Sequence, residues 1–197
     1  MSLVLLVGLG LESQDSMLQR VQRLLFADEE KRREEKGQAV VDTITKEGGE
    51  AWYHFMDMTS TESVEKLFTD TAEKFGKIDI LVNNAANFGL KDGRVDELTQ
   101  SVALQYGKQN IRCNCVRPGL IVTPQNEAHV PQALKDIFLS NIMVNRYGCP
   151  EDIGYMCVYL ASDESSYVSG QIMNVDGGLN SHVSTVAQFR ELNSRTW

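Results

Sequence analysis

The stretch KIDILVNNAA, residues 77–86, decides the fold class of this chain. Its apolar residues run almost without interruption from Ile78 to Val82, which is typical of a strand that is buried on both faces. The polar turn Asn83-Asn84-Ala85 follows at once, so the strand ends there. Strands of this kind belong to parallel sheets that helices cover on both sides. The stretch therefore predicts an α/β protein.

The pattern on either side of this stretch alternates between helix and strand. A capping box at Thr59-Ser-Thr-Glu62 predicts the start of a helix, and Gly76 predicts its end. Pro150 predicts the first position of a later helix. The other expected strands are 51–56, 111–116 and 172–175, and the other expected helices are 38–47 and 95–106. This alternation predicts a Rossmann-like, doubly wound parallel sheet in a single domain over residues 1–197.

Composition and charge disfavour several classes of function. The 197 residues carry a formal net charge of −8, whereas nucleic acids and anionic membrane surfaces attract basic proteins. No apolar run approaches the ~20 residues of a membrane helix, and the start MSLVLLVGLGLE lacks the features of a signal peptide. We therefore expect a cytoplasmic protein. The four cysteines include no C-x-x-C pair, so we expect core thiols rather than zinc ligands or disulfides: Cys113, Cys115, Cys149 and Cys157.

The residues that follow the expected strands are the first candidates for a binding site, because ligands of such sheets bind outside the carboxyl ends of the strands. Asp57-Met58, Asn83-Asn84-Ala85 and the run from Pro118 to Thr123 occupy these positions. Together with IRCNCVRPG at 111–119 and SGQIMNVDGG at 169–178, they resemble the short-chain dehydrogenase/reductase family. The resemblance covers roughly residues 34–90 and 93–178. It implies an NAD(P)-dependent oxidoreductase that acts on an alcohol or a ketone.

The resemblance also implies how the adenine half of the cofactor would be held. The carboxylate of Asp57 would accept a hydrogen bond from the exocyclic amine of the adenine, and the backbone of Met58 would add a contact there. The Asn83-Asn84-Ala85 turn would let the backbone pass close beneath the cofactor. The amide side chains of this turn would brace the neighbouring strands.

At the nicotinamide half, the resemblance implies that Pro118-Gly119 leaves room for the ring. The backbone of Ile121 and the hydroxyl of Thr123 would hold the carboxamide and the phosphate side. The segment Asn174-Val-Asp176-Gly-Gly resembles a structural strand and turn that lies near a subunit interface in the family.

The first 33 residues depart from the family pattern. Gly8 fits the first glycine of the family's phosphate-binding turn, but Glu12 and Gln14 occupy the positions of the other two. A carboxylate would repel the pyrophosphate and side chains would block its approach, so a plain buried strand is the preferred interpretation. Asp28 lies 20 positions after Gly8, where an acid would bind a ribose hydroxyl and favour NAD over NADP. A solvated acid beside the charge run of residues 27–37 is equally compatible with the sequence.

The catalytic residues of the family have no counterparts in this chain. The family uses a Tyr-x-x-x-Lys pair on one helix, in which the lysine lowers the pKa of the tyrosine so that it can exchange a proton with the substrate. Alignment on Val95 and Leu98 puts Phe88 in the tyrosine position and Asp92 in the lysine position. The strand that carries the family's catalytic serine is absent, as are its flanking helices. We therefore assign no catalytic residue, and we predict a junction near residues 87–93.

Two interpretations follow for the function. The chain is either an NAD(P)-dependent alcohol or ketone oxidoreductase by family, or a non-catalytic spliced, truncated or pseudoenzyme form that binds cofactor weakly or pairs with full-length subunits. The second is preferred. The seven junction residues span at most ~25 Å, enough to reach a neighbouring strand. The missing strand would either expose two strand edges or force them to pair with each other. Residues 124–147 are expected to form a substrate lid or a helix that packs on a neighbour.

Overall fold

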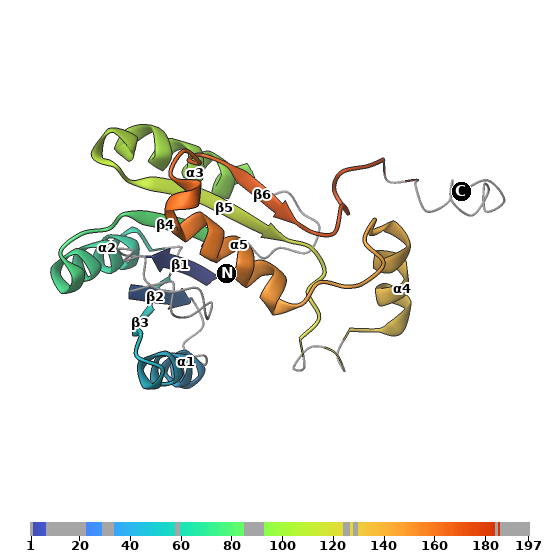
Figure 1. The fold of residues 1–197 in the computed structure, drawn as a ribbon, viewed down its shortest axis with the longest axis horizontal. Helices are drawn as coiled ribbons and strands as arrows, with labels where there is room; N and C mark the ends of the chain where they lie inside the picture. Colours follow the sequence, from blue (N-terminus) through green and yellow to red (C-terminus); the bar gives the residue numbers. More distant parts are fainter. Residues whose placement is uncertain are drawn as a thin grey trace.

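The structure is a computed structural model that describes residues 2–6, 23–28, 34–57, 60–84, 93–123, 127, 130–183 and 185. Its centre is a six-stranded sheet in the order β3-β2-β1-β4-β5-β6 (Figure 1). The strands are β1 (Ser2–Leu6), β2 (Arg23–Asp28), β3 (Glu50–Phe55), β4 (Ile80–Asn84), β5 (Arg112–Pro118) and β6 (Ile172–Val175). The helices are α1 (Glu34–Lys46), α2 (Thr61–Phe75), α3 (Gly93–Tyr106), α4 (Gln132–Asn141), α5 (Pro150–Ala161) and the 3-10 turns η2 (Gly107–Gln109) and η3 (Asp163–Ser165). The predicted Rossmann-like α/β fold is confirmed.

One strand departs from the predicted parallel arrangement. Strands β2, β3, β4, β5 and β6 share one direction, whereas β1 is antiparallel to both of its neighbours. Leu6, at the end of β1, lies opposite Leu24 and Ile80 at the starts of β2 and β4. Neighbouring parallel strands require a crossover of a dozen or more residues, but antiparallel neighbours need only a loop at one end of the sheet. The link between β1 and β2 therefore needs no crossover.

Strands β4 and β5 pair directly with each other. Their parallel ladder runs from Ile80 opposite Arg112 to Asn84 opposite Val116. Of the two outcomes predicted for the missing central strand, the structure has the paired one, and no strand edge is left open between β4 and β5. The hydrogen bonds of a parallel ladder join backbone groups, and the apolar side chains of β4 and β5 are compatible with a buried pair of strands. The predicted reduced sheet is therefore closed at this junction.

The apolar run of β4 contributes to a hydrophobic core on each face of the sheet. Leu81 packs with Leu67 and Phe75 of α2 on one face. Ile80 and Val82 pack on the other face with residues of α5, which crosses in front of β4 and β5 in Figure 1. Because successive side chains of a strand point to opposite faces, a strand between two helical layers must be apolar at nearly every position.

The ends of two helices follow from their capping residues. Ser60 has extended backbone angles and its hydroxyl accepts from the backbone N–H of Ser63 at 3.2 Å, so it is the N-cap of α2. The predicted box, which began at Thr59, was therefore wrong by one residue. Gly76 ends α2 with a φ of 81°, a left-handed conformation that suits glycine. Pro150 is the first residue of α5, as predicted.

The region beyond the carboxyl ends of β5 and β6 contains α4, which stands past both arrowheads in Figure 1. No residue of α4 itself is fully buried, while Ile142, the next residue, is 4% exposed. The helix is thus attached to the domain through its end. None of the described helices has the length and apolar character needed to cross a bilayer.

Candidate functional site

Most of the predicted site residues lie at one edge of the sheet. The five strands of common direction end at Asp28, Phe55, Asn84, Pro118 and Val175, and these ends face the same way. In sheets of this strand order, dinucleotides bind across the crevice where the order reverses, which here lies between β1 and β4. The backbone of Asp28 ends β2 at this edge, whereas its side chain lies outside the described part of the chain.

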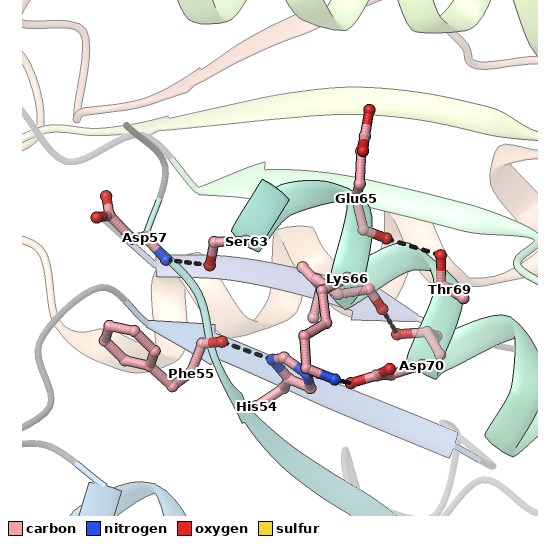
Figure 2. A network of polar contacts seen from close by, with 10 residues as sticks. His54, Phe55, Asp57, Ser63, Glu65, Lys66, Thr69 and Asp70 are labelled. Carbon is pink, nitrogen blue, oxygen red and sulfur yellow. Dashed lines mark hydrogen bonds and ion pairs between the residues drawn. The ribbon is translucent and has the colours of Figure 1, made fainter. Parts of the chain in front are cut away.

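Asp57 follows β3 at this edge and is half-buried. Its backbone N–H donates to the hydroxyl of Ser63 at 2.9 Å. Its backbone carbonyl accepts from the N–H of Ser60 at 3.1 Å. Figure 2 shows the amide directed at Ser63 and the carboxylate directed away from α2. The first turn of α2 therefore fixes both backbone polar groups of Asp57. The predicted partner Met58 lies outside the described residues.

A polar network ties the end of β3 to the middle of α2 (Figure 2). His54 Nε2 lies 2.9 Å from Asp70 Oδ2, and Lys66 Nζ donates to the same oxygen at 2.7 Å. The hydrogen bond from Lys66, followed by that with His54, holds the pKa of Asp70 below its usual value. The ring of Trp52 meets His54 edge-on, with centroids 5.1 Å apart. These contacts fix the strand that carries Asp57.

The two asparagines that end β4 differ in their surroundings. Asn83 is 2% exposed, and its side-chain amide donates to the hydroxyl of Thr99 on α3 at 2.9 Å. Thr99 in turn donates to the carbonyl of Val95 at 2.7 Å. The side-chain oxygen of Asn84 is buried and has no hydrogen-bond partner within the described part of the chain. Asn83 thus braces the sheet against α3, while Asn84 has a hydrogen-bond acceptor at the edge of the sheet. The predicted residue Ala85 lies outside the described residues.

The residues at the end of β5 form a close contact with the turn after β6. A Cβ on Gly119 would lie 2.6 Å from the Cα of Asp176, so a side chain there would collide with backbone. The carboxylate of Asp176 holds this turn, because it accepts from the N–H of Gly178 at 2.9 Å and from that of Asn180 at 3.0 Å. Packing against the β6 turn is therefore a second reason for glycine, beside the predicted space for the nicotinamide.

Ile121 and Thr123 continue from this contact along the same edge. Ile121 forms a parallel bridge with Gly148, and the hydrogen bonds run through its neighbours: the N–H of Val122 donates to Gly148 at 2.9 Å. The carbonyl of Thr123 accepts from the N–H of Glu127 at 2.9 Å. The loop after β5 is thereby anchored to the segment that precedes α5.

A cavity of about 460 Å³ opens beside this loop and includes Gly119 and Ile121 in its lining. Further lining residues are Val144, Met156 and Tyr155, so the cavity can accommodate a small, mainly apolar molecule. At its wall, Arg146 donates to both carboxylate oxygens of Asp152 at 2.7 Å. These bonds hold the pKa of Asp152 well below its usual value. The pair orders the segment between α4 and α5.

The positions of the family's proton relay lie outside the residues that the structure describes. Phe88 and Asp92, the predicted replacements for the tyrosine and the lysine, lie outside them, as do Gly8, Glu12 and Gln14. Tyr106 ends α3 next to Ile111, whose N–H bonds its carbonyl at 3.4 Å, so it lies at the amino end of β5. It is therefore at the opposite edge of the sheet from the predicted site.

Several residues that organise this edge carry no clear signal in the sequence. Ser63 and Thr99 are ordinary helix residues by pattern, and their partners Asp57 and Asn83 precede them by 6 and 16 positions. Arg117 pairs with Asp96 between β5 and α3, 21 positions apart. Only the bond from the N–H of Cys149 to Asp152, at 2.9 Å, is local enough to be expected from an acid in the first turn of α5.

Two family models match the chain, one on each side of the predicted junction. The short chain dehydrogenase model matches residues 7–93, and the Enoyl-(Acyl carrier protein) reductase model matches residues 89–180. The 7alpha-hydroxysteroid dehydrogenase of Clostridium sardiniense is 30% identical over 211 residues, which cover 75% of this chain and 80% of that protein. The alignment is longer than the 197 residues of this chain, so the relative contains residues without counterparts here. Two further curated relatives match over only 39% and 40% of their own length.

Solved structures share the fold. A 7 alpha-hydroxysteroid dehydrogenase complexed with NADH and 7-oxo glycochenodeoxycholic acid has a TM-score of 0.65 at 24% identity, covering 78% of this chain and 83% of that one. A gluconate 5-dehydrogenase from Burkholderia cenocepacia in complex with NADP and tartrate has a TM-score of 0.64 at 21% identity, covering 81% of this chain and 86% of that one.

Proposed function

Since this chain belongs to the short-chain dehydrogenase/reductase family of oxidoreductases, we propose that it binds a nicotinamide dinucleotide weakly and does not turn over an alcohol or a ketone by itself. The observation that carries the binding half is the common edge formed by the ends of β2, β3, β4 and β5. The described residues Asp57, Asn84 and Gly119, which belong to the expected cofactor contacts, lie at this edge, and this supports the proposal.

The residues present fit the two ends of such a cofactor. Asp57 would receive the adenine amine, and Asp28 would bind the ribose hydroxyls and favour NAD over NADP. Pro118, Gly119 and the backbone of Ile121 would border the nicotinamide. A bound cofactor supplies the hydride transfer, and the protein supplies position and orientation. Relatives named with NADH and with NADP support a nicotinamide cofactor in general.

The fit is poor at the centre of the cofactor, which is why we propose weak binding. In the family's layout the pyrophosphate meets a glycine-rich turn directly after the first strand. Here β1 ends with Leu6 at the opposite edge of the sheet. Glu12 and Gln14 also replace two of the three glycines. The affinity must then come from the adenine and nicotinamide ends.

The absence of turnover follows from the residue types at the positions of the proton relay. Phe88 has no proton to transfer, and the carboxylate of Asp92 cannot lower the pKa of a neighbouring phenol as an ammonium does. The serine that would orient the substrate oxygen has no counterpart. A substrate alcohol bound beside the nicotinamide would have no group to take its proton.

Cofactor titration tests both halves of this proposal. We expect NADH to quench protein fluorescence or raise the Tm more than NADPH does, and Asp57→Ala to remove the effect. We expect no change in nicotinamide absorbance when NAD and a panel of alcohols, including 7-hydroxysteroids, are added. Measurable oxidation by the purified chain would refute the inactive assignment, and failure of both NADH and NADPH to bind would refute the cofactor site.

A second candidate function is pairing with full-length members of the family. The exposed apolar side chains of α4, α5 and the segment between them favour it, since Ile137 is 60%, Val144 50% and Tyr155 65% exposed. Strand β6 is also the outer strand of the described sheet. Mixing this chain with a full-length relative should give a heteromeric species in light scattering after size exclusion, and separate elution of the two proteins would exclude it.

A further inference from the structure

We propose that Ser63 is the positioning residue that directs the Asp57 carboxylate toward the adenine amine, an inference that rests on the proposed dinucleotide site. Ser63 would not touch the cofactor. It would act through the backbone of Asp57, because the backbone fixes the Cα–Cβ bond from which the carboxylate extends and limits the rotamers that it can adopt.

The geometry around Asp57 leaves its backbone little freedom. The N–H donates to the Ser63 hydroxyl at 2.9 Å, and the carbonyl accepts from the N–H of Ser60 at 3.1 Å. The first contact depends on a side chain and can be removed by substitution, whereas the second is backbone to backbone. In Figure 2 the carboxylate lies on the side of Asp57 away from Ser63. Ser63 thus restrains the backbone of Asp57 from the side opposite the carboxylate.

The hydroxyl of Ser63 is itself a fixed acceptor, because α2 is held at several points. The Ser60 cap fixes the first turn, and Leu67 and Thr71 are 0% exposed against the sheet. Further along, Asp70 binds both His54 of β3 and Lys66, so the strand and the helix cannot slide past each other without breaking this network. Lys74 lies over the Trp52 ring on the same side. The Asp57–Ser63 bond therefore joins two rigid elements.

Preorganisation explains why this bond affects recognition. A carboxylate already directed at the amine loses little conformational freedom when the ligand binds, so more of the hydrogen-bond energy appears as affinity. Without Ser63 Oγ, the Asp57 amide would bond to water and the backbone that carries the carboxylate would be less restrained. The loss corresponds to one ordinary hydrogen bond, or about five- to tenfold in Kd.

The experiment compares NADH with its hypoxanthine analogue, in which an oxo group replaces the adenine amine. The wild-type chain should bind NADH more tightly than the analogue. Ser63→Ala should weaken NADH binding about five- to tenfold and leave binding of the analogue unchanged, so the discrimination falls. Ser63→Thr keeps the hydroxyl and should discriminate between the two ligands as the wild type does. Ser63→Cys carries a thiol of similar size that accepts hydrogen bonds only weakly, so it should behave as Ser63→Ala does. It takes the place of Ser63→Ala in the comparison if Ser63→Ala fails to fold.

Ser60→Ala is the matched control. It removes the helix cap and lowers the Tm, but it leaves the Ser63 hydroxyl on Asp57, so the discrimination between the two ligands should persist. Full discrimination in Ser63→Ala and Ser63→Cys would overturn the positioning role while the cofactor site stands. Equal wild-type affinity for both ligands would also overturn it. Absence of NADH binding in the wild type would overturn the cofactor site as well.

Discussion

The pairing of β5 with β6 and the pairing of β4 with β5 are two joints of one sheet that are braced differently. Around β5 and β6, Asn114 and Arg112 bond backbone groups that lie 48 to 57 positions away in the chain, and Asp176 bonds the backbone of its own turn. None of the buried side-chain oxygen or nitrogen atoms described in 111–123 and 130–183 lacks a partner. At the β4–β5 junction, one buried oxygen each of Asn84 and Asp96 lacks a partner among the described residues.

The difference separates two kinds of contact at the β4–β5 junction, the backbone hydrogen bonds and the side-chain hydrogen bonds. The hydrogen bonds of the β4–β5 ladder join backbone groups, so the sheet closes where a strand of the family is absent. Side-chain partners are specific to their positions and are not replaced when a segment is missing. Among the described residues, the junction therefore has a complete backbone ladder, while two of its buried side-chain oxygens have no partner. Such unpaired groups cost stability at this joint.

The largest expected effect comes from breaking the better-braced joint at Asn114. Its amide donates to the carbonyl of Val168 at 3.0 Å and accepts from the N–H of Gln171 at 3.1 Å. Asn114→Leu removes both bonds at a fully buried position, leaves the N–H of Gln171 unpaired, and leaves the carbonyl of Val168 only the bond from Arg112 at 3.3 Å, so we expect a loss of about 4 kcal/mol in the free energy of unfolding. Urea denaturation measures it. Gln171→Ala, which keeps the backbone N–H, should stay within about 0.5 kcal/mol of wild type, and an equal loss would contradict the assignment.

The next largest effect is expected at the contact between Gly119 and the β6 turn. Gly119→Ala places a Cβ against the backbone of Asp176, so we expect destabilisation by about 3 kcal/mol. Gly107→Ala is the control, because nothing lies within 4 Å of its added Cβ. That variant should be neutral or slightly stabilising. Thermal unfolding of both variants measures the difference. Similar Tm values would show that the turn after β6 moves to accommodate the added Cβ without a cost in stability.

The adjacent asparagines of β4 sharpen the comparison within the weaker joint. Asn83→Ala removes the bond to Thr99 and should cost about 2 kcal/mol. Asn84→Ala removes an oxygen without a described partner, so it should cost less than about 1 kcal/mol in the absence of ligand. Chemical denaturation of the two variants in parallel tests this order. If Asn84→Ala were more destabilising than Asn83→Ala, the side chain of Asn84 would contribute to the stability of the junction, which would contradict the prediction.

The smallest effect is expected at the Arg146–Asp152 pair, since Arg146 is 56% exposed and solvent screens the interaction. The guanidinium lowers the pKa of Asp152, so the pair stabilises the fold above the unfolded-state pKa of about 3.9 and this contribution declines as the pH falls through the folded-state pKa. The Tm difference between wild type and Asp152→Asn should therefore be larger near pH 7 than near pH 3. It should also shrink with added salt. A difference independent of pH would exclude this ion pair as its source.

Local patterns predicted most of the fold but few of its long-range contacts. The strand Ile172–Val175 and the start of α5 at Pro150 agree with the expectation, because strand alternation and proline geometry act within a few residues. The direction of β1 differs from the expected parallel arrangement, because apolar residues favour a buried strand in either direction. The site followed the same division. Asp57 and Gly119 were identifiable from motifs, whereas the bond of Ser63 with Asp57 and the contact of Gly119 with Asp176 depend on partners that only the folded chain brings together.

The burial of Cys113 has a practical consequence. This thiol is 0% exposed between the sheet and α3, and burial raises its pKa to about 12, so at neutral pH almost none of it is thiolate. An alkylating reagent can react with it only after the joint around β5 opens and water enters. Its labelling rate under native conditions would then follow the opening equilibrium of that joint, which makes this cysteine an intrinsic reporter of local unfolding.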